Sequence, residues 1–284
     1  MKPKQKIILG TVQFGMAYGI NNLSGVPDKN ELTLILGEAY KQGIDILDTA
    51  FAYGNAETRI GEIDDCHNFK IISKFSKGKD LEDQLLTSLS RLGRESIYGY
   101  LSHNADYLIS NPGLWEILLK AKEKNQVQKI GFSLYTTAQL EQLLKMGMTP
   151  DLVQLPYSLL DRKFENYFNE LKSIGTEIHV RSVFLQGLYF RDMDKLPEKL
   201  IPIKPSLERI QLVCKEHSLS IGSLALNFVA LNKYIDKVVV GVECVSQLIE
   251  NLKMVTSWQG NETAFSQIKN INIPQKELLN PANW

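Results

Sequence analysis

The sequence predicts a single α/β domain over residues 1–284, a (β/α)8 TIM barrel whose active site lies at the C-terminal ends of the strands. Eight short apolar runs alternate with segments of helical period, and the runs lack polar–apolar alternation. Such runs are typical of strands buried on both faces of a parallel sheet. No linker or shift of composition divides the chain, and its length suits one barrel, which takes about 250 residues.

The eight predicted strands share this apolar character. They cover Ile7–Val12, Ile44–Asp48, Lys70–Lys74, Ile97–Ser102, Val127–Ser133, Leu152–Leu155, Glu177–Ser182 and Lys237–Val242. Strands that alternate with helices imply parallel pairing through right-handed crossovers. Eight such units favour a closed barrel. An open doubly wound sheet is the alternative, but its Gly-x-Gly-x-x-Gly turn is missing after the early strands.

Three of the intervening segments carry residues that start and stop helices. In each, an N-cap residue is followed within four positions by a carboxylate, and a glycine ends the segment. The sets are Asp28, Glu31 and Gly43; Asp80, Asp83 and Gly93; and Thr137, Glu141 and Gly147. Two regions are less regular: the long, polar segment Gln186–Ser206, and the tail after Trp258, which we expect to fold over one barrel face.

Composition excludes several function classes. Lys and Arg total 32, Asp and Glu total 32, and the formal net charge is zero, so no electrostatic footprint for nucleic acid or an anionic membrane exists. The three cysteines have no metal-ligand spacing, and so sparse a set fits a reducing compartment. No apolar run approaches a signal peptide or the roughly 20 residues of a membrane span. We predict a cytoplasmic protein without a metal.

Active sites of such barrels form where the strands end. Several predicted strands end at a polar residue, and because the strands are parallel these side chains meet at one face. They are Gln13, Asp48, Lys74, His103, Ser133, Gln154, Arg181 with Ser182, and Glu243, to which the loop after the second strand adds Tyr53.

Four of these residues suggest proton chemistry. A buried ammonium at Lys74 needs a partner, and Asp48 on the neighbouring strand is the candidate. Tyr53 reaches the same place, and an adjacent ammonium would lower the pKa of its phenol below the usual value of about 10. Such a tyrosine can give a proton to a developing alkoxide, and His103 could donate a second hydrogen bond to the same oxygen.

Each of the four also has a structural interpretation on its own. Asp48 could be a helix cap, Tyr53 a packed aromatic, Lys74 a residue whose stem lies on the barrel rim, and His103 a turn residue. Their convergence at successive strand ends favours a functional site.

Several short motifs follow one another along the chain. They are Gly10-Thr-Val-Gln-Phe-Gly15, Leu47-Asp-Thr-Ala50, Tyr53-Gly-Asn-Ala-Glu57, Lys74, Ser102-His103, Gly131-Phe-Ser133, Gln154-Leu-Pro-Tyr157, Arg181-Ser182 with Gln186-Gly187, and Gly241 with Gln247-Leu-Ile-Glu-Asn251. From Ile7 to Trp284 this ordered set resembles the aldo-keto reductases. The resemblance implies an oxidoreductase of the alcohol dehydrogenase or carbonyl reductase type that transfers hydride from NADPH or NADH to an aldehyde or ketone carbon.

The resemblance also implies roles for individual residues. Tyr53 would be the general acid, Lys74 would lower its pKa, Asp48 would pair with Lys74, and His103 would orient the carbonyl. Further residues match positions that bind the cofactor. The carboxamide of the nicotinamide would be held by Ser133 and Gln154, and the pyrophosphate by Ser182, Phe184 and Gln186. The adenosine end would be bound by Gly241, Val242, Glu243, Gln247, Glu250 and Asn251. A helix starting near Ser246 would point its positive end toward phosphate.

Three departures from the family pattern stand out. Leu134 stands where the family often has an asparagine, directly after the serine that corresponds to Ser133. Arg181 stands where an aromatic often stacks on the nicotinamide, and although a guanidinium can stack as well, its charge disfavours the oxidised, cationic ring. Glu243 stands where NADPH-preferring members place a basic or small polar residue. A carboxylate repels a 2′-phosphate but can accept from a free ribose hydroxyl, so Glu243 predicts a shift toward NADH unless it points to solvent.

The substrate pocket is less defined by the sequence. We expect its walls from Met16–Asn22, Phe51, Tyr135, the Gln186–Ser206 segment and the C-terminal tail, around a small carbonyl compound bound by a monomer. Two other functions remain open: a cofactor-binding regulatory or redox-sensing subunit with slow turnover, and an unrelated barrel enzyme acting on phosphorylated metabolites. The absence of a glycine pair after the seventh strand weighs against the second of these.

Overall fold

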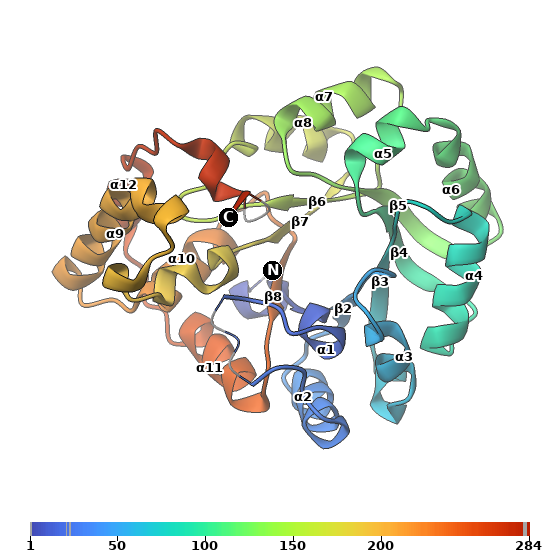
Figure 1. The fold of residues 1–284 in the computed structure, drawn as a ribbon, viewed down its shortest axis with the longest axis horizontal. Helices are drawn as coiled ribbons and strands as arrows, with labels where there is room; N and C mark the ends of the chain where they lie inside the picture. The colour runs from blue at the N-terminus through green and yellow to red at the C-terminus, as the bar shows by residue number, and fades with distance from the viewer. Residues whose placement is uncertain (1, 21, 23, 281–282) are drawn as a thin grey trace.

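Eight parallel strands close into a barrel in sequence order in the computed structural model, which describes residues 2–20, 22, 24–280 and 283–284 (Figure 1). The strands are β1 (Ile7–Gly10), β2 (Ile46–Asp48), β3 (Lys70–Phe75), β4 (Ile97–Ser102), β5 (Val127–Ser133), β6 (Leu152–Pro156), β7 (Glu177–Arg181) and β8 (Lys237–Gly241). Pairing of β1 with β8, which sets Gly10 opposite Gly241, closes the barrel. The predicted fold class is therefore confirmed, and β4 and β5 have the predicted bounds.

Helices surround the barrel and connect its strands (Figure 1). They are α1 (Val12–Gly15), α2 (Lys29–Lys41), α3 (Ala56–Gly61), α4 (Leu81–Leu92), α5 (Ala105–Ser110), α6 (Gly113–Glu123), α7 (Thr137–Lys145), α8 (Phe168–Ser173), α9 (Lys204–Glu216), α10 (Ile221–Ala230), α11 (Val245–Thr256) and α12 (Glu262–Lys269). Short 3-10 turns are η1 (Pro3–Lys6), η2 (Asp64–Asn68), η3 (Glu165–Tyr167), η4 (Leu185–Phe190), η5 (Met193–Lys195), η6 (Glu198–Ile203) and η7 (Lys276–Leu279). In the described part of the chain no helix is both long and apolar enough to cross a bilayer.

Two of the three predicted helix caps are confirmed. The carboxylates of Asp28 and Asp80 each accept the backbone N–H three residues on, at 2.8 and 3.0 Å. The third prediction is wrong by one residue. The cap of α7 is Thr136, whose hydroxyl accepts from the N–H of Gln139 while the Gln139 amide oxygen accepts from the N–H of Thr136. A glutamine closes this capping box as well as a carboxylate does.

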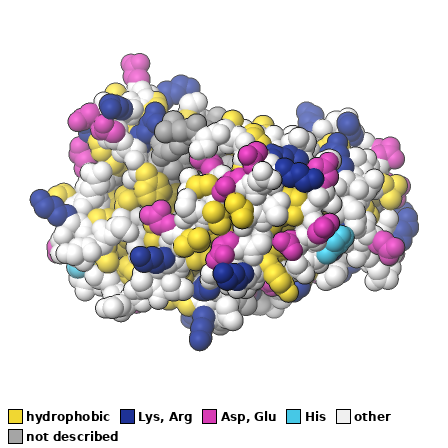
Figure 2. Space-filling view, turned by 90° about the horizontal axis from the view of Figure 1, so that it is seen from below, with side chains coloured by type: hydrophobic (Ala, Val, Ile, Leu, Met, Phe, Trp, Pro, Cys, Tyr) yellow, Lys and Arg dark blue, Asp and Glu magenta, His cyan; other side chains and the backbone are white. Residues whose placement is uncertain are grey.

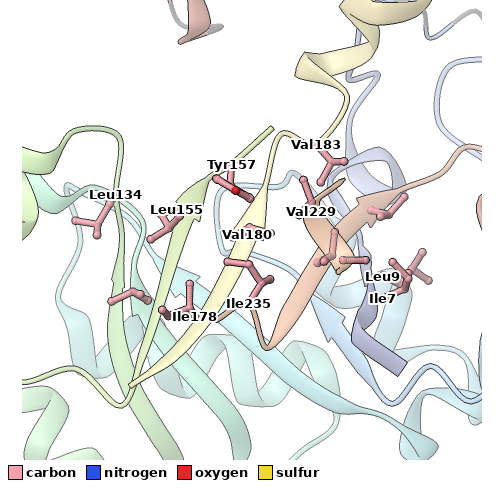
Figure 3. Packing of buried hydrophobic residues seen from close by; sticks show 14 of the residues in the cluster. Ile7, Leu9, Leu134, Leu155, Tyr157, Ile178, Val180, Val183, Val229 and Ile235 are labelled. Atoms are coloured by element: carbon pink, nitrogen blue, oxygen red, sulfur yellow. The ribbon is translucent and has the colours of Figure 1, made fainter. Parts of the chain in front are cut away.

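The core follows the two-residue alternation of the strands. In β1, Ile7 and Leu9 point into the layer between strands and helices, whereas Ile8 points into the barrel with Ile46 and Ile72. Figure 3 shows part of the outer layer, with side chains of β6 and β7, such as Leu155 and Val180, in one part of the view and Ile7 and Leu9 of β1 in another. Because apolar residues fill the middle of the barrel, polar groups gather at its two ends.

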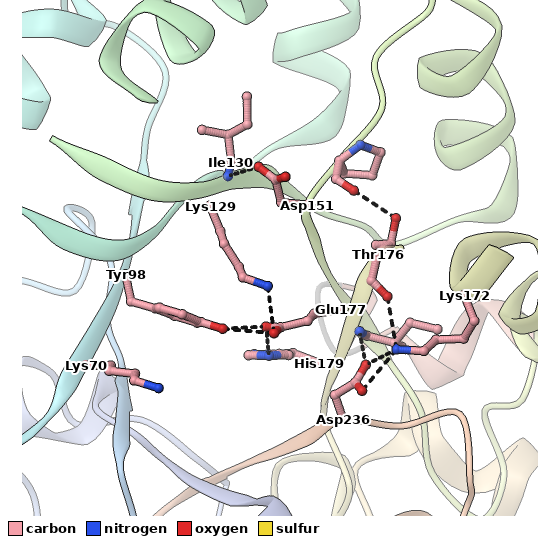
Figure 4. A network of polar contacts seen from close by, with 12 residues as sticks. Lys70, Tyr98, Lys129, Ile130, Asp151, Lys172, Thr176, Glu177, His179 and Asp236 are labelled. Carbon is pink, nitrogen blue, oxygen red and sulfur yellow. Dashed lines mark hydrogen bonds and ion pairs between the residues drawn. The ribbon is translucent and has the colours of Figure 1, made fainter. Parts of the chain in front are cut away.

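One end of the barrel, at the strand starts, holds a polar network (Figure 4). Glu177 lies at its centre and accepts hydrogen bonds from the Tyr98 hydroxyl at 2.9 Å and the Lys129 ammonium at 2.7 Å. The buried His179 ring lies 3.4 Å from the same carboxylate. Burial raises the pKa of Glu177, but the nearby His179 ring and the contacts with Lys129 and Tyr98 outweigh it and hold that pKa at about 2. This end of such a barrel serves stability, which leaves the other end for function.

The surface is electrically mixed. Figure 2, which views the molecule from the side of α2 and α11, shows acidic and basic side chains interspersed with apolar ones. This pattern matches the zero formal net charge.

Candidate active site

A cavity of about 720 Å³ lies at the carboxyl ends of the strands. Every site residue expected from the sequence lines it except Lys74 and Val242. Those that line it are Asp48, Tyr53, His103, Ser133, Gln154, Arg181, Ser182, Phe184, Gln186, Gly241, Glu243, Gln247, Glu250 and Asn251. The side chain of Val242 is buried in the outer core, because alternation after the inward Gly241 turns it away from the cavity.

Asp48 and Lys74 form a buried ion pair beneath the cavity floor. The Lys74 ammonium lies 2.7 Å from Asp48 Oδ1 and also donates to the Thr49 carbonyl at 2.8 Å. The second carboxylate oxygen of Asp48 accepts from Gln154 Nε2 at 2.7 Å. The side chains of Lys74 and Asp48 are 1% and 3% exposed. Burial lowers the pKa of Lys74, although the Asp48 carboxylate opposes that shift. The predicted pairing is present, and Asp48 is fixed through both oxygens.

Tyr53 stands directly above this pair. Its ring meets the His103 ring edge to face, with centroids 5.5 Å apart, and the Lys74 ammonium lies 5.2 Å from its centroid. Glycine at position 15 allows the chain to approach closely here, since an added Cβ on Gly15 would lie 2.0 Å from the Tyr53 carbonyl oxygen. The Gly10–Gly15 motif therefore sets the position of the tyrosine turn.

The charge states differ from the expectation. The predicted lowering of the Tyr53 pKa by Lys74 is wrong: burial raises this pKa, the Asp48 carboxylate raises it further, and Arg181 opposes them. The reason is that Asp48 lies against Lys74 and compensates its charge. Burial, with Lys74 and Arg181, lowers the pKa of His103 to about 3. Near neutral pH the site therefore presents a protonated phenol beside a neutral imidazole.

Arg181 ends β7 and projects its charge into the cavity. Its guanidinium stacks 4.3 Å from the Tyr135 ring centroid and donates to the Leu134 carbonyl at 3.0 Å. Among the described residues no carboxylate lies within ion-pair distance of it. Leu134, one of the departures, thus holds Arg181 through its backbone while its side chain is buried.

The segment after β7 has an unusual backbone. Ser182, Leu185 and Gln186 adopt φ of +63°, +46° and +54°. Non-glycine residues in this left-handed region cost free energy and cluster at ligand clamps. Gln186 also donates from Nε2 to the Tyr18 hydroxyl at 2.6 Å, so the segment after β7 and the segment after α1 meet over the cavity.

The far end of the cavity is formed by β8 and α11. The backbone N–H of Glu243 donates to Gln247 Oε1 at 2.9 Å, and burial raises the pKa of Glu243. An added Cβ on Gly241 would lie 2.5 Å from Gln13 Oε1, an atom buried without a hydrogen-bond partner in the described structure. A backbone cradle beside an unsatisfied amide oxygen fits a polar ligand such as a nucleotide.

The cavity walls agree in part with those expected. Met16, Tyr18 and Tyr135 line it, while Asn21, within the expected segment, is outside the described residues. Phe51 is not a wall, because its ring packs against the Arg91 guanidinium at 4.6 Å. Tyr189 is not one either, since it is buried against Ser158.

The rest of the cavity wall consists partly of expected residues and partly of residues that were not predicted. Phe190 and Gly187 of the Gln186–Ser206 segment line the cavity, but no described residue of the C-terminal tail does, and Pro281 and Ala282 are outside the described residues. A further group of lining residues, mostly neighbours of predicted ones, was not predicted as part of the site: Gly10, Thr11, Val12, Ala52, Val183, Val239, Val240 and Met254. Except for Ala52 and Met254, each lies within or shortly after β1, β7 or β8, and this position is the signal that could have found them.

Comparison with known proteins agrees with this geometry. A model of the Aldo/keto reductase family matches residues 6–273. The NADH-specific methylglyoxal reductase of Escherichia coli is 23% identical over 264 residues, which cover 76% of this chain and 79% of that protein. The structure of aldo-keto reductase AKR11C1 from Bacillus halodurans, in its holo form, superposes with a TM-score of 0.73 and 20% identity over 94% of this chain and 91% of the other. At 20% identity, the similarity to this structure concerns the fold alone.

Proposed function

Because the chain belongs to the aldo/keto reductase family, we propose that it reduces a small aldehyde or ketone with Tyr53 as the proton donor. NAD(P)H-dependent reduction of carbonyl compounds is the general activity of this family, and the chain is an oxidoreductase that uses NADPH or NADH. The observation that carries the proposal is the meeting of Tyr53 and His103 in the cavity, above the buried Asp48–Lys74 pair.

The cofactor, when bound, supplies the hydride, and the side chains of the cavity handle the oxygen and the proton. A carbonyl oxygen between Tyr53 and His103 receives hydrogen bonds from the phenol and the neutral imidazole. As negative charge develops on that oxygen, the phenol passes its proton to it. The resulting phenolate lies near the Lys74 ammonium, which Asp48 holds in place.

The raised pKa of Tyr53 suits this role in the reductive direction. A phenol that stays protonated is ready to donate, and Arg181 lowers the cost of the phenolate that follows. Ser133 and Gln154 lie opposite each other on the adjacent strands β5 and β6 and would hold the carboxamide of the nicotinamide. Because Gln154 Nε2 already donates to Asp48, the side-chain carbonyl oxygen of Gln154 is left for the ligand.

Aromatic and apolar walls favour a small, uncharged carbonyl compound. The cavity is lined by Met16, Tyr18, Tyr135 and Phe190, and the Escherichia coli relative is named for methylglyoxal. We therefore take methylglyoxal and related small aldehydes as the first substrates to test.

Tyr53→Phe tests the assignment. We expect the rate of NADH-dependent reduction to fall by about 100-fold or more, the usual contribution of a positioned acid, while the Kd for NADH stays within about twofold. Tyr135→Phe removes a phenol from the same cavity and serves as the control. Wild-type turnover by Tyr53→Phe would refute the role of Tyr53. Nucleotide binding without turnover in the wild type would favour the regulatory subunit instead.

A further inference from the structure

Glu31 links two helices from opposite ends of the chain. Its backbone N–H is capped by Asp28 within α2, but its carboxylate leaves that helix. Glu31 Oε1 accepts the backbone N–H of Val245, the first residue of α11, at 2.6 Å. α2 and α11 lie side by side (Figure 1), and Glu31 is half-buried between them.

This contact caps α11 from outside. The N-cap residue of α11, Cys244, makes no side-chain capping bond, whereas the first N–H groups of any helix lack partners within the helix and carry partial positive charge. A carboxylate that accepts one of them through a short, charge-assisted bond neutralises the end of the helix. The same end is the position at which a phosphate would otherwise find its hydrogen-bond donors.

The capped end adjoins the wall of the cavity. Val245 lies between Glu243 and Gln247, both of which line the wall, and Glu250 lines it one turn further along α11. In the described structure Arg181 is the one Arg or Lys side chain that lines the cavity, and it stands on β7, away from this end. Two carboxylates, Glu243 and Glu250, therefore line the far end of the cavity, and Glu31 adds a third behind that wall at the first N–H of α11.

We propose that Glu31 is a specificity-determining residue that selects NAD(H) over NADP(H), because its carboxylate occupies the amino end of α11 beside Glu243. The inference rests on the proposed function, and it assigns the far end of the cavity to the adenosine ribose. A 2′-phosphate placed there meets negative charge and an occupied helix end, whereas a ribose hydroxyl can donate to a carboxylate.

Glu31→Gln separates charge from capping, because the amide oxygen can still accept from Val245. We would measure the Kd of NADH and of NADPH by calorimetry in the wild type, Glu31→Gln, Glu243→Gln and the double variant. We expect Glu31→Gln to tighten NADPH binding about fivefold, which is the scale expected when one partly screened charge is removed. The double variant should tighten NADPH binding further. The Kd of NADH should change by less than about twofold.

Two controls keep the test specific. Glu38→Gln removes a carboxylate of the same helix that pairs with Lys41 rather than with the first N–H of α11, and should leave both Kd values unchanged. Raising the salt concentration should reduce the discrimination in the wild type but not in the double variant. An unchanged NADPH Kd in Glu31→Gln overturns the inference. Failure of both nucleotides to bind the wild type overturns the proposed function itself.

Discussion

Asp48→Asn should lower the free energy of unfolding by about 3–5 kcal/mol, the usual cost of leaving one member of a buried ion pair without its partner. The structure places this pair at the upper end of that range. The two charged atoms are 2.7 Å apart, and the side chains are 1% and 3% exposed, so water cannot replace the lost partner. The remaining bond from Lys74 to the Thr49 carbonyl supplies a dipole and no charge.

Lys74→Met should cost less than Asp48→Asn. The carboxylate left behind still accepts from Gln154 Nε2 at 2.7 Å, and a carboxyl group can also take up a proton. The double variant Asp48→Asn with Lys74→Met removes both charges together, so we expect it to be more stable than Asp48→Asn alone, with a coupling free energy of about 3 kcal/mol.

Urea unfolding of the wild type, the two single variants and the double variant at pH 7 measures this cycle. Additive losses in the double variant would show that the two charges do not stabilise each other, and would refute the reasoning. Reduction of methylglyoxal separates stability from chemistry. Lys74 does not line the cavity, and the amide that replaces the Asp48 carboxylate keeps an oxygen that can accept from Gln154 Nε2. The double variant should therefore bind NADH almost normally while its turnover falls by about 100-fold.

Three further predictions concern charge. His103, with a pKa of about 3, should leave kcat/KM for reduction flat between about pH 5 and 8; an inflection near pH 6.5 that His103→Gln abolishes would contradict this. Glu177→Gln should cost about 2 kcal/mol in urea unfolding at pH 7 and less at pH 3, because a carboxylate with a pKa of about 2 stabilises above its ordinary pKa and loses that contribution as pH falls toward 2; an equal cost at both pH values would refute it. Arg181→Met should tighten NAD⁺ binding about fivefold more than NADH binding, whereas Arg181→Lys, which keeps the charge, should leave the ratio of the two Kd values unchanged.

The strands were predictable because each is buried on both faces. Such burial leaves short, mainly apolar runs, as in β4 and β5, whose bounds were predicted without error. The strand ends were less certain where a polar residue follows directly. β1 stops at Gly10 because Val12 begins the short helix α1, and the sequence itself contains no signal for that helix.

The composition of the site was predictable for a related reason. Parallel strands all end at one face, so polar residues at those ends meet there whatever the exact packing. Their charge states were not predictable, because these depend on burial and on distances. Asp48 lies close enough to Lys74 to compensate its ammonium, and as a result the pKa of Tyr53 moves in the direction opposite to the one expected.

Glu31 shows most clearly where prediction from sequence stops. The capping pattern Asp28–Glu31 accounts for the residue within α2, so no local signal points to a second contact 214 positions away in the chain. That contact exists because β1 and β8 pair to close the barrel, which brings α2 and α11 together. The amino end of α11 therefore gains its cap from the first quarter of the chain when the barrel closes. A chain that has not paired β1 with β8 lacks this cap on α11, so this end of the cavity should form together with barrel closure.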